Sequence, residues 1–329
     1  MRGISVVVPV YNESENIALC LEELISVLSP LQEPYEIIFI DDGSSDGTPE
    51  ILAEAAQNNG NVVLIEFRRN FGQTAAMAAG FEHARYEFVV PMDGDLQNDP
   101  AEIGKMIEKI DEGYDLVAGW RKNRQDAFIS RKLPSRIANR IISWATGVSL
   151  HDYGCSLKVM RSDVAKSIKL YGEMHRFIPA LAAEFGAKIA EVPVNHRPRI
   201  HGSSKYGISR TIRVILDLLT VKFLLGFAKR PIHLFGSIGL LSGLTGGVIL
   251  ALITIQKFLF HVPLGNRPIL LLGVLLLILG VQFLAFGLLA EVLTRTYHES
   301  QEKPIYHVRR LRRFRSRGES SLPLESLTN

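Results

Sequence analysis

Acidic side chains that directly follow short apolar runs are the residues of this sequence best suited to chemistry. They are Glu13, Asp41, Asp42, Asp93 and Asp95. In an open α/β sheet, ligands bind beyond the carboxyl ends of the strands, so these carboxylates are predicted to face one crevice. Carboxylates gathered in this way repel one another unless a cation joins them, and a hard divalent ion such as Mg²⁺ shares its oxygen ligands with substrate phosphates. The pattern therefore predicts a metal-assisted site for a phosphate-bearing ligand.

Each of these segments has a simpler interpretation when it is taken alone. The segment DDGSSDGT at 41–48 is typical of a turn, and an Asp-x-Asp pair such as that at 93–95 is common. Because the segments occur in order, each at the end of a predicted strand, their combination favours a site over unrelated turns.

The elements that must position these side chains alternate along residues 1–200. Apolar β-branched runs predict strands at 4–10, 35–40, 62–67, 88–92 and 115–118. Helical patterns lie between them at 16–28, 49–57, 73–84 and 100–111. This alternation predicts an α/β domain with a mostly parallel sheet covered on both faces.

The composition excludes several classes of protein. Of the 329 residues, 47% are hydrophobic and 22% are charged, which excludes a disordered chain. Two cysteines, Cys20 and Cys155, cannot form a disulfide framework. The formal net charge of +3 is too small to indicate a nucleic-acid partner, and none is expected.

Two charge-free runs, at 234–256 and 268–290, are each long enough to cross a bilayer as a helix. Buried helices of a large soluble core are the alternative, but unbroken apolar runs of this length are rare in soluble folds. Glycines recur every four residues at Gly239, Gly243 and Gly247 and every seven at Gly273, Gly280 and Gly287, so each set is predicted to line one helix face and allow close packing. The ordinary enrichment of glycine in membrane helices is the alternative.

The distribution of Lys and Arg predicts the orientation of these spans. Residues 201–230 hold six basic residues and 295–317 hold eight, whereas the loop at 257–267 holds two. The positive-inside rule therefore places both termini and the α/β domain in the cytoplasm, in a multi-pass protein of the cell inner membrane. No signal peptide is expected at the N-terminus. The predicted organisation is an α/β domain at 1–200, an acceptor loop and membrane-interface helix at 201–232, two spans at 233–293 and a basic, partly disordered tail at 294–329.

Several motifs together resemble the family-2 inverting glycosyltransferases, and more narrowly the polyprenyl-phosphate glycosyltransferases related to dolichyl-phosphate mannose synthase. The matching segments are PVYNE at 9–13, DDGSSDGT at 41–48, RNFGQ at 69–73, DGDLQ at 93–97, GWR ending at 121, DYGCSLKVMR at 152–161, HRFIP at 175–179 and GSSKY at 202–206. The resemblance covers about residues 1–300 and includes the bacterial undecaprenyl-phosphate sugar transferases, with the DYGC segment closest to the aminoarabinose branch. It implies a GT-A type nucleotide-sugar-binding domain.

The resemblance also implies a role for each matching residue at the donor end. Pro9, Tyr11, Glu13 and either Asp41 or Asp42 would hold the base and ribose of a UDP- or GDP-sugar. Asp93 would face the ribose or the metal, and Asp95 and Gln97 would ligate Mg²⁺ or Mn²⁺ together with the diphosphate.

At the acceptor end, the resemblance implies that Arg121, Arg131 and Ser135 hold a lipid phosphate, with Arg199 and Lys205 in a loop beside it. An ordinary solvated charge remains the alternative for Arg121 and Arg131.

The catalytic residues implied by the resemblance are Asp95, Arg121 and Asp152. Some relatives carry an aspartate where this chain has Ser156, and Asp152 is the nearest acid. A phosphate monoester has a second pKa of about 6, so the acceptor is already largely an anion at neutral pH and needs positioning more than a base. Whether Asp152 acts as a base therefore stays open.

These residues predict the transfer of one sugar from a nucleotide sugar to polyprenyl phosphate, specifically undecaprenyl phosphate, with inversion, giving a lipid-linked sugar for glycan or lipid modification. The resemblance also implies a homo-oligomer, with a tetramer as one form. A processive polysaccharide synthase is an alternative, but its Q-x-x-R-W motif precedes neither Trp120 nor Trp144. A non-catalytic scaffold or flippase subunit would not need the acidic strand ends. A dinucleotide oxidoreductase is excluded because no G-x-G-x-x-G follows the first predicted strand.

Overall fold

The computed structural model describes residues 1–122, 142–143, 146–170, 172, 174–198, 231–261, 263, 267–300 and 308–313. The chain divides into two compact units, Met1–Leu218 together with Pro304–Asn329, and Leu219–Lys303. The predicted interface helix lies within 201–230, outside the described residues.

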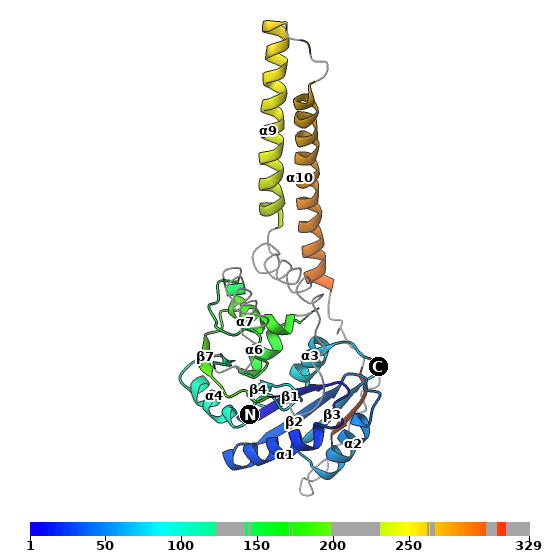
Figure 1. Cartoon of the computed structure of the whole chain (residues 1–329), viewed down its shortest axis with the longest axis vertical. Coiled ribbons are helices and arrows are strands. Elements are labelled where there is room, and N and C mark those ends of the chain that lie inside the picture. The colour runs from blue at the N-terminus through cyan, green and yellow to red at the C-terminus, as the bar shows by residue number, and fades with distance from the viewer. Residues whose placement is uncertain are drawn as a thin grey trace. The chain divides into compact units, whose positions relative to one another are not determined.

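The first unit alternates strands and helices as the sequence predicts (Figure 1). Its elements are β1 Ile4–Val10, α1 Ile17–Leu28, β2 Tyr35–Asp41, α2 Thr48–Asn58, β3 Val62–Phe67, α3 Gln73–His83, β4 Phe88–Pro91, α4 Glu102–Asp111, β5 Leu116–Trp120, β6 Lys158–Arg161, α6 Ser162–Ser167, α7 Ile178–Glu184, β7 Ile189–Pro193 and β8 Val308–Arg313, with short 3₁₀ turns at Ser29–Leu31 and Met174–Phe177.

The strands form an eight-stranded sheet in the order β7-β5-β6-β4-β1-β2-β3-β8. Parallel pairs join β1 to β2 and β4, β2 to β3, and β5 to β7. Antiparallel pairs join β6 to β4 and β5, and β8 to β3. The prediction of a mostly parallel sheet is therefore confirmed, and the carboxyl ends of β1, β2 and β4 open at the same edge.

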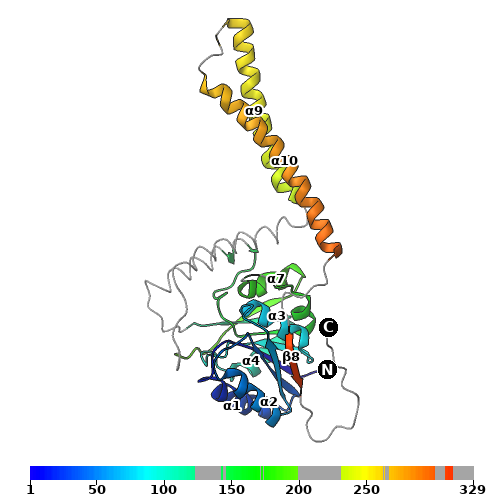
Figure 2. The same ribbon diagram turned by 90° about the vertical axis from the view of Figure 1, so that its right-hand side faces the viewer.

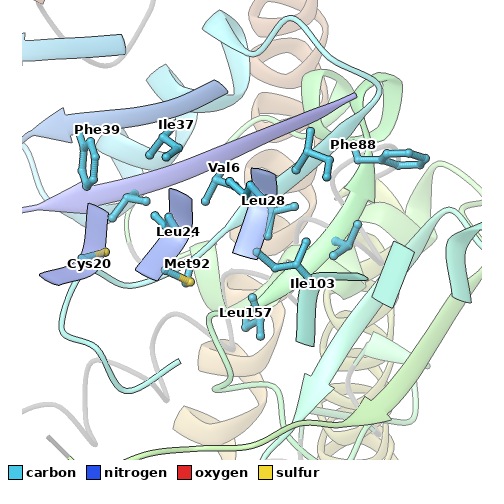
Figure 3. Close-up of a cluster of buried hydrophobic side chains, with 14 of the residues drawn as sticks. Val6, Cys20, Leu24, Leu28, Ile37, Phe39, Phe88, Met92, Ile103 and Leu157 are labelled. Carbon is cyan, nitrogen blue, oxygen red and sulfur yellow. The ribbon is translucent and has the colours of Figure 1, made fainter. Parts of the chain in front are cut away.

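Helices cover both faces of this sheet (Figure 1). Alternate side chains of β1, such as Val6 and Val8, pack in one core cluster with α1, α2 and α4, and Figure 3 shows Val6 beside Leu24, Leu28 and Ile37. The intervening Val7 faces the opposite side, where α3 lies. Successive side chains of β1 therefore point to opposite faces of the sheet, and helices bury both faces.

The contact between α3 and β1 depends on Gly80. A methyl group at Gly80 would lie 2.2 Å from Cγ1 of Val7, so the helix backbone packs directly on the Val7 side chain. We expect Gly80→Ala to lower the free energy of unfolding by about 1–3 kcal/mol through overpacking, less the ~1 kcal/mol that alanine contributes to helix propensity. The melting temperature of the purified chain measures this effect.

Gly104→Ala in α4 is the matched control, because a methyl group there would lie 3.4 Å from Cδ2 of Leu31, an ordinary contact. That variant should keep or raise the melting temperature. Equal shifts for both variants would contradict the close approach of α3 to β1.

The C-terminal segment contains a strand that the sequence did not predict. The sequence places residues 294–329 in a partly disordered tail, yet α10 continues to Ser300 and Val308–Arg313 forms β8, the edge strand labelled in Figure 2. β8 pairs with β3 from Val63↔Arg313 to Phe67↔Val308. The sequence did not predict this strand, because backbone pairing with an open sheet edge orders a segment that has little apolar periodicity of its own.

The second unit contains two long helices, α9 Pro231–Phe260 and α10 Pro268–Ser300, which lie side by side (Figure 1 and Figure 2). The stretches Ile232–Phe260 and Pro268–Ala290 have mean hydropathies of 2.2 and 2.8, and only 17% and 11% of their most apolar windows are buried. Largely exposed apolar helices of this length are unlike the core helices of a soluble protein and are candidate membrane spans.

Glycines bring α9 and α10 into close contact, but only part of the predicted pattern holds. Methyl groups at Gly239 and Gly280 would each lie 2.8 Å from the carbonyl oxygen of the other glycine, and one at Gly246 would lie 2.7 Å from the carbonyl oxygen of Gly273. A methyl group at Gly247 would meet nothing within 4 Å. A methyl group at Gly280 would also lie 2.8 Å from the backbone of Gly243, so the predicted four-residue spacing holds from Gly239 to Gly243 and is wrong only for Gly247.

Candidate active site

A cavity of about 280 Å³ lies at the carboxyl ends of β1, β2 and β4. Its lining combines residues from four of the matching segments: Pro9, Val10, Tyr11, Glu13, Asp42, Asn70, Gly72, Gln73, Asp93, Gly94 and Asp95. The expectation that strand ends carry acidic groups to one crevice is therefore met for Glu13, Asp42, Asp93 and Asp95. Asp41 and Gln97 do not line this cavity.

The loop after β1 is locked to the loop after β2. The Asn12 amide donates to Oγ of Ser44 at 2.9 Å, and the Ser45 amide donates back to Oδ1 of Asn12 at 2.9 Å. Asn12 has φ +53°, a left-handed conformation that asparagine tolerates better than most residues. The Glu13 amide also donates to Oγ1 of Thr48 at 3.0 Å. This exchange holds Tyr11 and Glu13 on the cavity wall.

The adjacent carboxylates of Asp41 and Asp42 organise different loops. Oδ1 of Asp41 accepts from the Ser44 amide at 3.0 Å and shapes its own turn. The two oxygens of Asp42 accept from the amides of Phe71 and Gly72 at 2.7 and 2.9 Å. Burial raises the pKa of both carboxyl groups, against the opposing effect of these hydrogen bonds. Of the two positions that the sequence left open, only Asp42 faces the cavity.

The loop after β4 carries the Asp-x-Asp pair. Oδ1 of Asp93 accepts from Nε2 of Gln73 at 2.7 Å, and Oδ1 of Asp95 accepts from the Gln97 amide at 3.2 Å. Leu96, which lies between Asp95 and Gln97, adopts φ +62° and its side chain is buried. A left-handed leucine costs roughly 1–2 kcal/mol and persists only where its surroundings hold it.

These carboxylates form a donor set suited to a hard divalent ion, because Asp93 and Asp95 both line one cavity and carboxylate oxygens are the ligands such an ion prefers. Within the described part of the chain, no three His, Cys, Asp or Glu side chains cluster as a complete metal site. Two carboxylates with positions left for phosphate oxygens match the way Mg²⁺ is usually bound.

Arg121 follows β5 and is held by Asp152 in a two-point ion pair. Nε of Arg121 lies 2.7 Å from Oδ2 of Asp152, and Nη2 lies 2.9 Å from Oδ1. The side chains are only 12% and 8% exposed. Burial by itself would lower the pKa of Arg121, but the hydrogen bonds and charge of Asp152 outweigh it and the pKa is raised. The interpretation of Arg121 as a solvated loop charge is therefore wrong.

The carboxylate of Asp152 is occupied on both oxygens. Oδ1 also accepts from the Gly154 amide at 3.1 Å, and the Asp152 amide donates to Glu191 at 2.9 Å. A carboxylate already bound to a guanidinium on both oxygens is poorly suited to take a proton from substrate. This geometry speaks against a base, the question that the sequence left open, and indicates that Asp152 positions Arg121.

Four residues matched to the acceptor end, Arg131, Ser135, Arg199 and Lys205, lie outside the described residues. The structure adds Asn70, Gly72 and Gln73 to the cavity wall, all from the RNFGQ segment, which had no assigned site role. It also adds His196, whose Nε2 lies 3.5 Å from Nη1 of Arg121. The RNFGQ motif could have indicated the first three, but nothing in the sequence linked His196 to Arg121.

The thiols lie in the core and have no sign of activation. Burial raises the pKa of Cys20 to about 12 and that of Cys155 to about 11. Both are free cysteines that stay protonated at neutral pH, as expected of packing residues.

Comparison with known proteins is consistent with this geometry. The model of Glycosyl transferase family 2 matches residues 5–169. The dodecaprenyl-phosphate galacturonate synthase of Rhizobium johnstonii is 45% identical over 312 residues, covering 94% of this chain and 92% of that protein. The undecaprenyl-phosphate 4-deoxy-4-formamido-L-arabinose transferase of Edwardsiella ictaluri is 39% identical over 314 residues, covering 94% of both.

Solved structures share the fold at lower identity. Mannosyl-3-phosphoglycerate synthase from Rubrobacter xylanophilus has a TM-score of 0.53 at 15% identity, covering 68% of this chain and 74% of that one. Glucosyl-3-phosphoglycerate synthase from Mycobacterium tuberculosis, in complex with Mn²⁺ and UDP-glucose, has a TM-score of 0.50 at 18% identity, covering 68% and 79%. The fold is the GT-A type that the motifs implied. Since the family model covers about half of the chain and the two relatives cover nearly all of it, the chain belongs to glycosyl transferase family 2.

Proposed function

We propose that this glycosyltransferase transfers a single sugar from a nucleotide sugar to a polyprenyl phosphate, with inversion at the anomeric carbon. The observation that carries the proposal is an acidic cavity at the strand ends in a chain that also has two candidate membrane spans. A soluble donor and a membrane-held acceptor require both parts. The names of the two relatives, which specify dodecaprenyl and undecaprenyl phosphate, support the same acceptor class.

The donor binds in the cavity after β1, β2 and β4. Pro9, Tyr11, Glu13 and Asp42 hold the base and ribose of a UDP- or GDP-sugar, while Asp41 supports them by shaping the turn at Ser44. Asp42 also fixes the Phe71–Gly72 backbone, so the loop that carries Asn70 and Gln73 keeps its place on the wall.

Asp93 and Asp95 are the residues that would hold Mg²⁺ or Mn²⁺, with Gln97 beside them. When bound, the cation supplies the Lewis-acid stabilisation that the departing nucleoside diphosphate needs. Gln73 fixes the Asp93 carboxylate and the Gln97 amide fixes that of Asp95, so both carboxylates are oriented before ligand arrives.

The acceptor phosphate binds Arg121. The resemblance adds four further residues that bind the same phosphate or lie in the loop beside it: Arg131, Ser135, Arg199 and Lys205. An oxygen of the lipid phosphate attacks the anomeric carbon as the bond from that carbon to the diphosphate breaks, and the nucleoside diphosphate leaves with the electron pair. With a second pKa of about 6, the phosphate monoester is an anion at neutral pH. Asp152 therefore acts by holding Arg121 rather than by removing a proton.

The membrane topology follows the same proposal. β8 follows the second candidate span and pairs with β3 of the catalytic unit. Two spans return the chain to its starting side, so the C-terminal strand and the N-terminal domain share one compartment. Together with the Lys and Arg distribution, this favours cytoplasmic termini in the cell inner membrane. The homo-oligomer, tetrameric or otherwise, stays a prediction. The glycine contacts described above join α9 to α10 within one chain.

A donor and acceptor screen tests the function. We expect the full-length chain in nanodiscs to form a lipid-linked monosaccharide from undecaprenyl phosphate and one nucleotide sugar, in a panel that includes UDP-galacturonic acid and UDP-4-deoxy-4-formamido-L-arabinose. Undecaprenol without its phosphate is the matched control and should give no product, because it lacks the anionic nucleophile. Product mass identifies the sugar, and the anomeric coupling constant reports inversion.

Other products would point to the rival functions. Chains of several sugars would favour a polysaccharide synthase. No turnover and no nucleotide binding across the UDP- and GDP-sugar panel would favour a non-catalytic subunit and contradict the proposal.

A further inference from the structure

Residues Asn195, His196 and Arg197, which follow β7, lie against the segment that carries the Asp-x-Asp pair. The Arg197 amide donates to the carbonyl oxygen of Gln97 at 2.9 Å, and His196 forms an antiparallel bridge with Asn98. Nδ2 of Asn195 donates to Oδ2 of Asp99 at 2.9 Å. Consecutive residues thus contact residues 97–99 through both backbone and side chain.

The guanidinium of Arg197 extends this contact to α1. Its Nη1 lies 2.8 Å from Oε2 of Glu23, and its Nη2 lies 2.8 Å from Oδ1 of Asp99. Asp99 is only 9% exposed, and its two oxygens accept from Arg197 and Asn195. Residues 93–99 form the Asp-x-Asp loop, also called the acidic loop. The end of this loop is therefore fixed to a core helix through one arginine.

The acidic loop needs such support because its backbone is strained. Leu96 is left-handed, and the loop closes on itself where the Asp93 amide donates to Oδ1 of Asn98 at 3.2 Å. Oδ1 of Asn98 also accepts from Oγ of Ser156 at 2.8 Å. Conformations of this kind persist only where surrounding contacts over-determine them.

The same three residues also reach the acceptor end. Nδ1 of His196 lies 3.0 Å from the carbonyl oxygen of Arg197, which accepts hydrogen bonds but cannot donate one. Nδ1 is therefore the protonated nitrogen, and Nε2 presents its lone pair to Nη1 of Arg121 at 3.5 Å. One short segment thus contacts the acidic loop on one side and Arg121 on the other.

We propose that Asn195–Arg197 is a clamp that holds the Asp-x-Asp loop at a fixed position relative to Arg121, and that Arg197 is the positioning residue of this clamp. The clamp keeps the end of the site that receives the diphosphate at a fixed place relative to the end that receives the acceptor phosphate. The meaning of those two ends rests on the proposed function, whereas the effect on the loop does not.

Hydrogen exchange of the full-length chain without ligand tests the clamp directly. We expect Arg197→Gln to speed exchange of the amides in residues 93–99, because the strained loop loses its tie to Glu23 and Asp99. Arg161→Gln is the matched control: Arg161 also bridges two carboxylates, Glu87 and Asp115, and its side chain is 31% exposed against 33% for Arg197. The control should lose a comparable ion pair without loosening 93–99.

Titration with Mn²⁺ and UDP or GDP gives the second readout. Arg197→Gln should weaken metal–diphosphate binding by about 10- to 100-fold, the range for outer partners that orient metal ligands, while Arg161→Gln binds as wild type. Arg197→Lys should recover only part of the loss, because one ammonium group cannot reproduce the two-sided fork.

Unchanged exchange in 93–99, or the same increase in Arg161→Gln, would overturn the clamp. A loosened loop with undiminished Mn²⁺–diphosphate binding would overturn its positioning role. A wild-type chain that binds no nucleoside diphosphate, with the loop loosened only in Arg197→Gln, would remove the proposed function and leave the structural clamp standing.

Discussion

Replacing Asp95 by asparagine is expected to lower sugar transfer by about three orders of magnitude. The substitution keeps the shape of the side chain and removes one of the two carboxylates, Asp93 and Asp95, that the Asp-x-Asp loop presents to the cavity. Stabilising the charge of a leaving diphosphate is worth several kcal/mol, and each ~1.4 kcal/mol is a factor of ten in rate. The measurement is the initial rate of lipid-linked product at saturating donor.

Metal titration separates this effect from a general loss of structure. Chelation should abolish transfer by the wild type, and added Mg²⁺ or Mn²⁺ should restore it, whereas Asp95→Asn should recover little at any metal concentration. Asp111→Asn is the control, since Asp111 pairs with Arg2 at the surface and lies outside the cavity. Full activity of the wild type after thorough removal of metal would rule out the metal-assisted mechanism.

The second large effect is expected at the Arg121–Asp152 pair. Asp152→Asn removes the charge that holds a guanidinium only 12% exposed, so Arg121 is left without its two-point partner. Breaking a buried pair from one side typically costs about 3–5 kcal/mol. We expect transfer to fall by about 10²- to 10³-fold, with little change in donor affinity. Removing a residue that orients another functional group typically costs about 10- to 100-fold in activity. Removing one group that stabilises charge in the transition state costs about 10²- to 10³-fold.

The pH profile distinguishes positioning from base catalysis. If Asp152 only holds Arg121, the variant should keep the acidic limb of the wild-type profile, because that limb reports the acceptor phosphate, which gains a proton as the pH falls through about 6. Arg121→Lys should behave like Asp152→Asn, since lysine cannot form the two-point contact. Loss of the acidic limb in Asp152→Asn, with normal binding of the acceptor, would instead identify Asp152 as the base.

The sequence determined the α/β class, the first five strands and the family, because each depends on information carried by neighbouring residues. Apolar β-branched runs place β1 to β5 within a few residues of their observed bounds. The order of the acidic motifs fixes which strand ends carry chemistry, since the carboxyl ends of parallel strands meet at one edge. The length of the two charge-free runs predicts the helices α9 and α10 for the same local reason.

Strands that depend on pairing were decided only by the tertiary structure. β6 and β8 are basic and short, and neither has the apolar alternation that marks a strand. They become strands because the open edges of β4, β5 and β3 supply backbone partners, an influence that depends on residues far away in sequence.

The role of each carboxylate in the site was likewise decided by contacts between segments that are distant in sequence. Asp41 and Asp42 are equivalent in sequence, yet one caps its own turn and the other holds the backbone of Phe71 and Gly72. The sequence left open whether Asp152 is a base, and the structure shows that Arg121, thirty-one residues earlier, occupies both of its oxygens. The types of residue predict the chemistry that is available, but which hydrogen bonds each carboxylate accepts depends on how the loops from separate strands meet at the sheet edge.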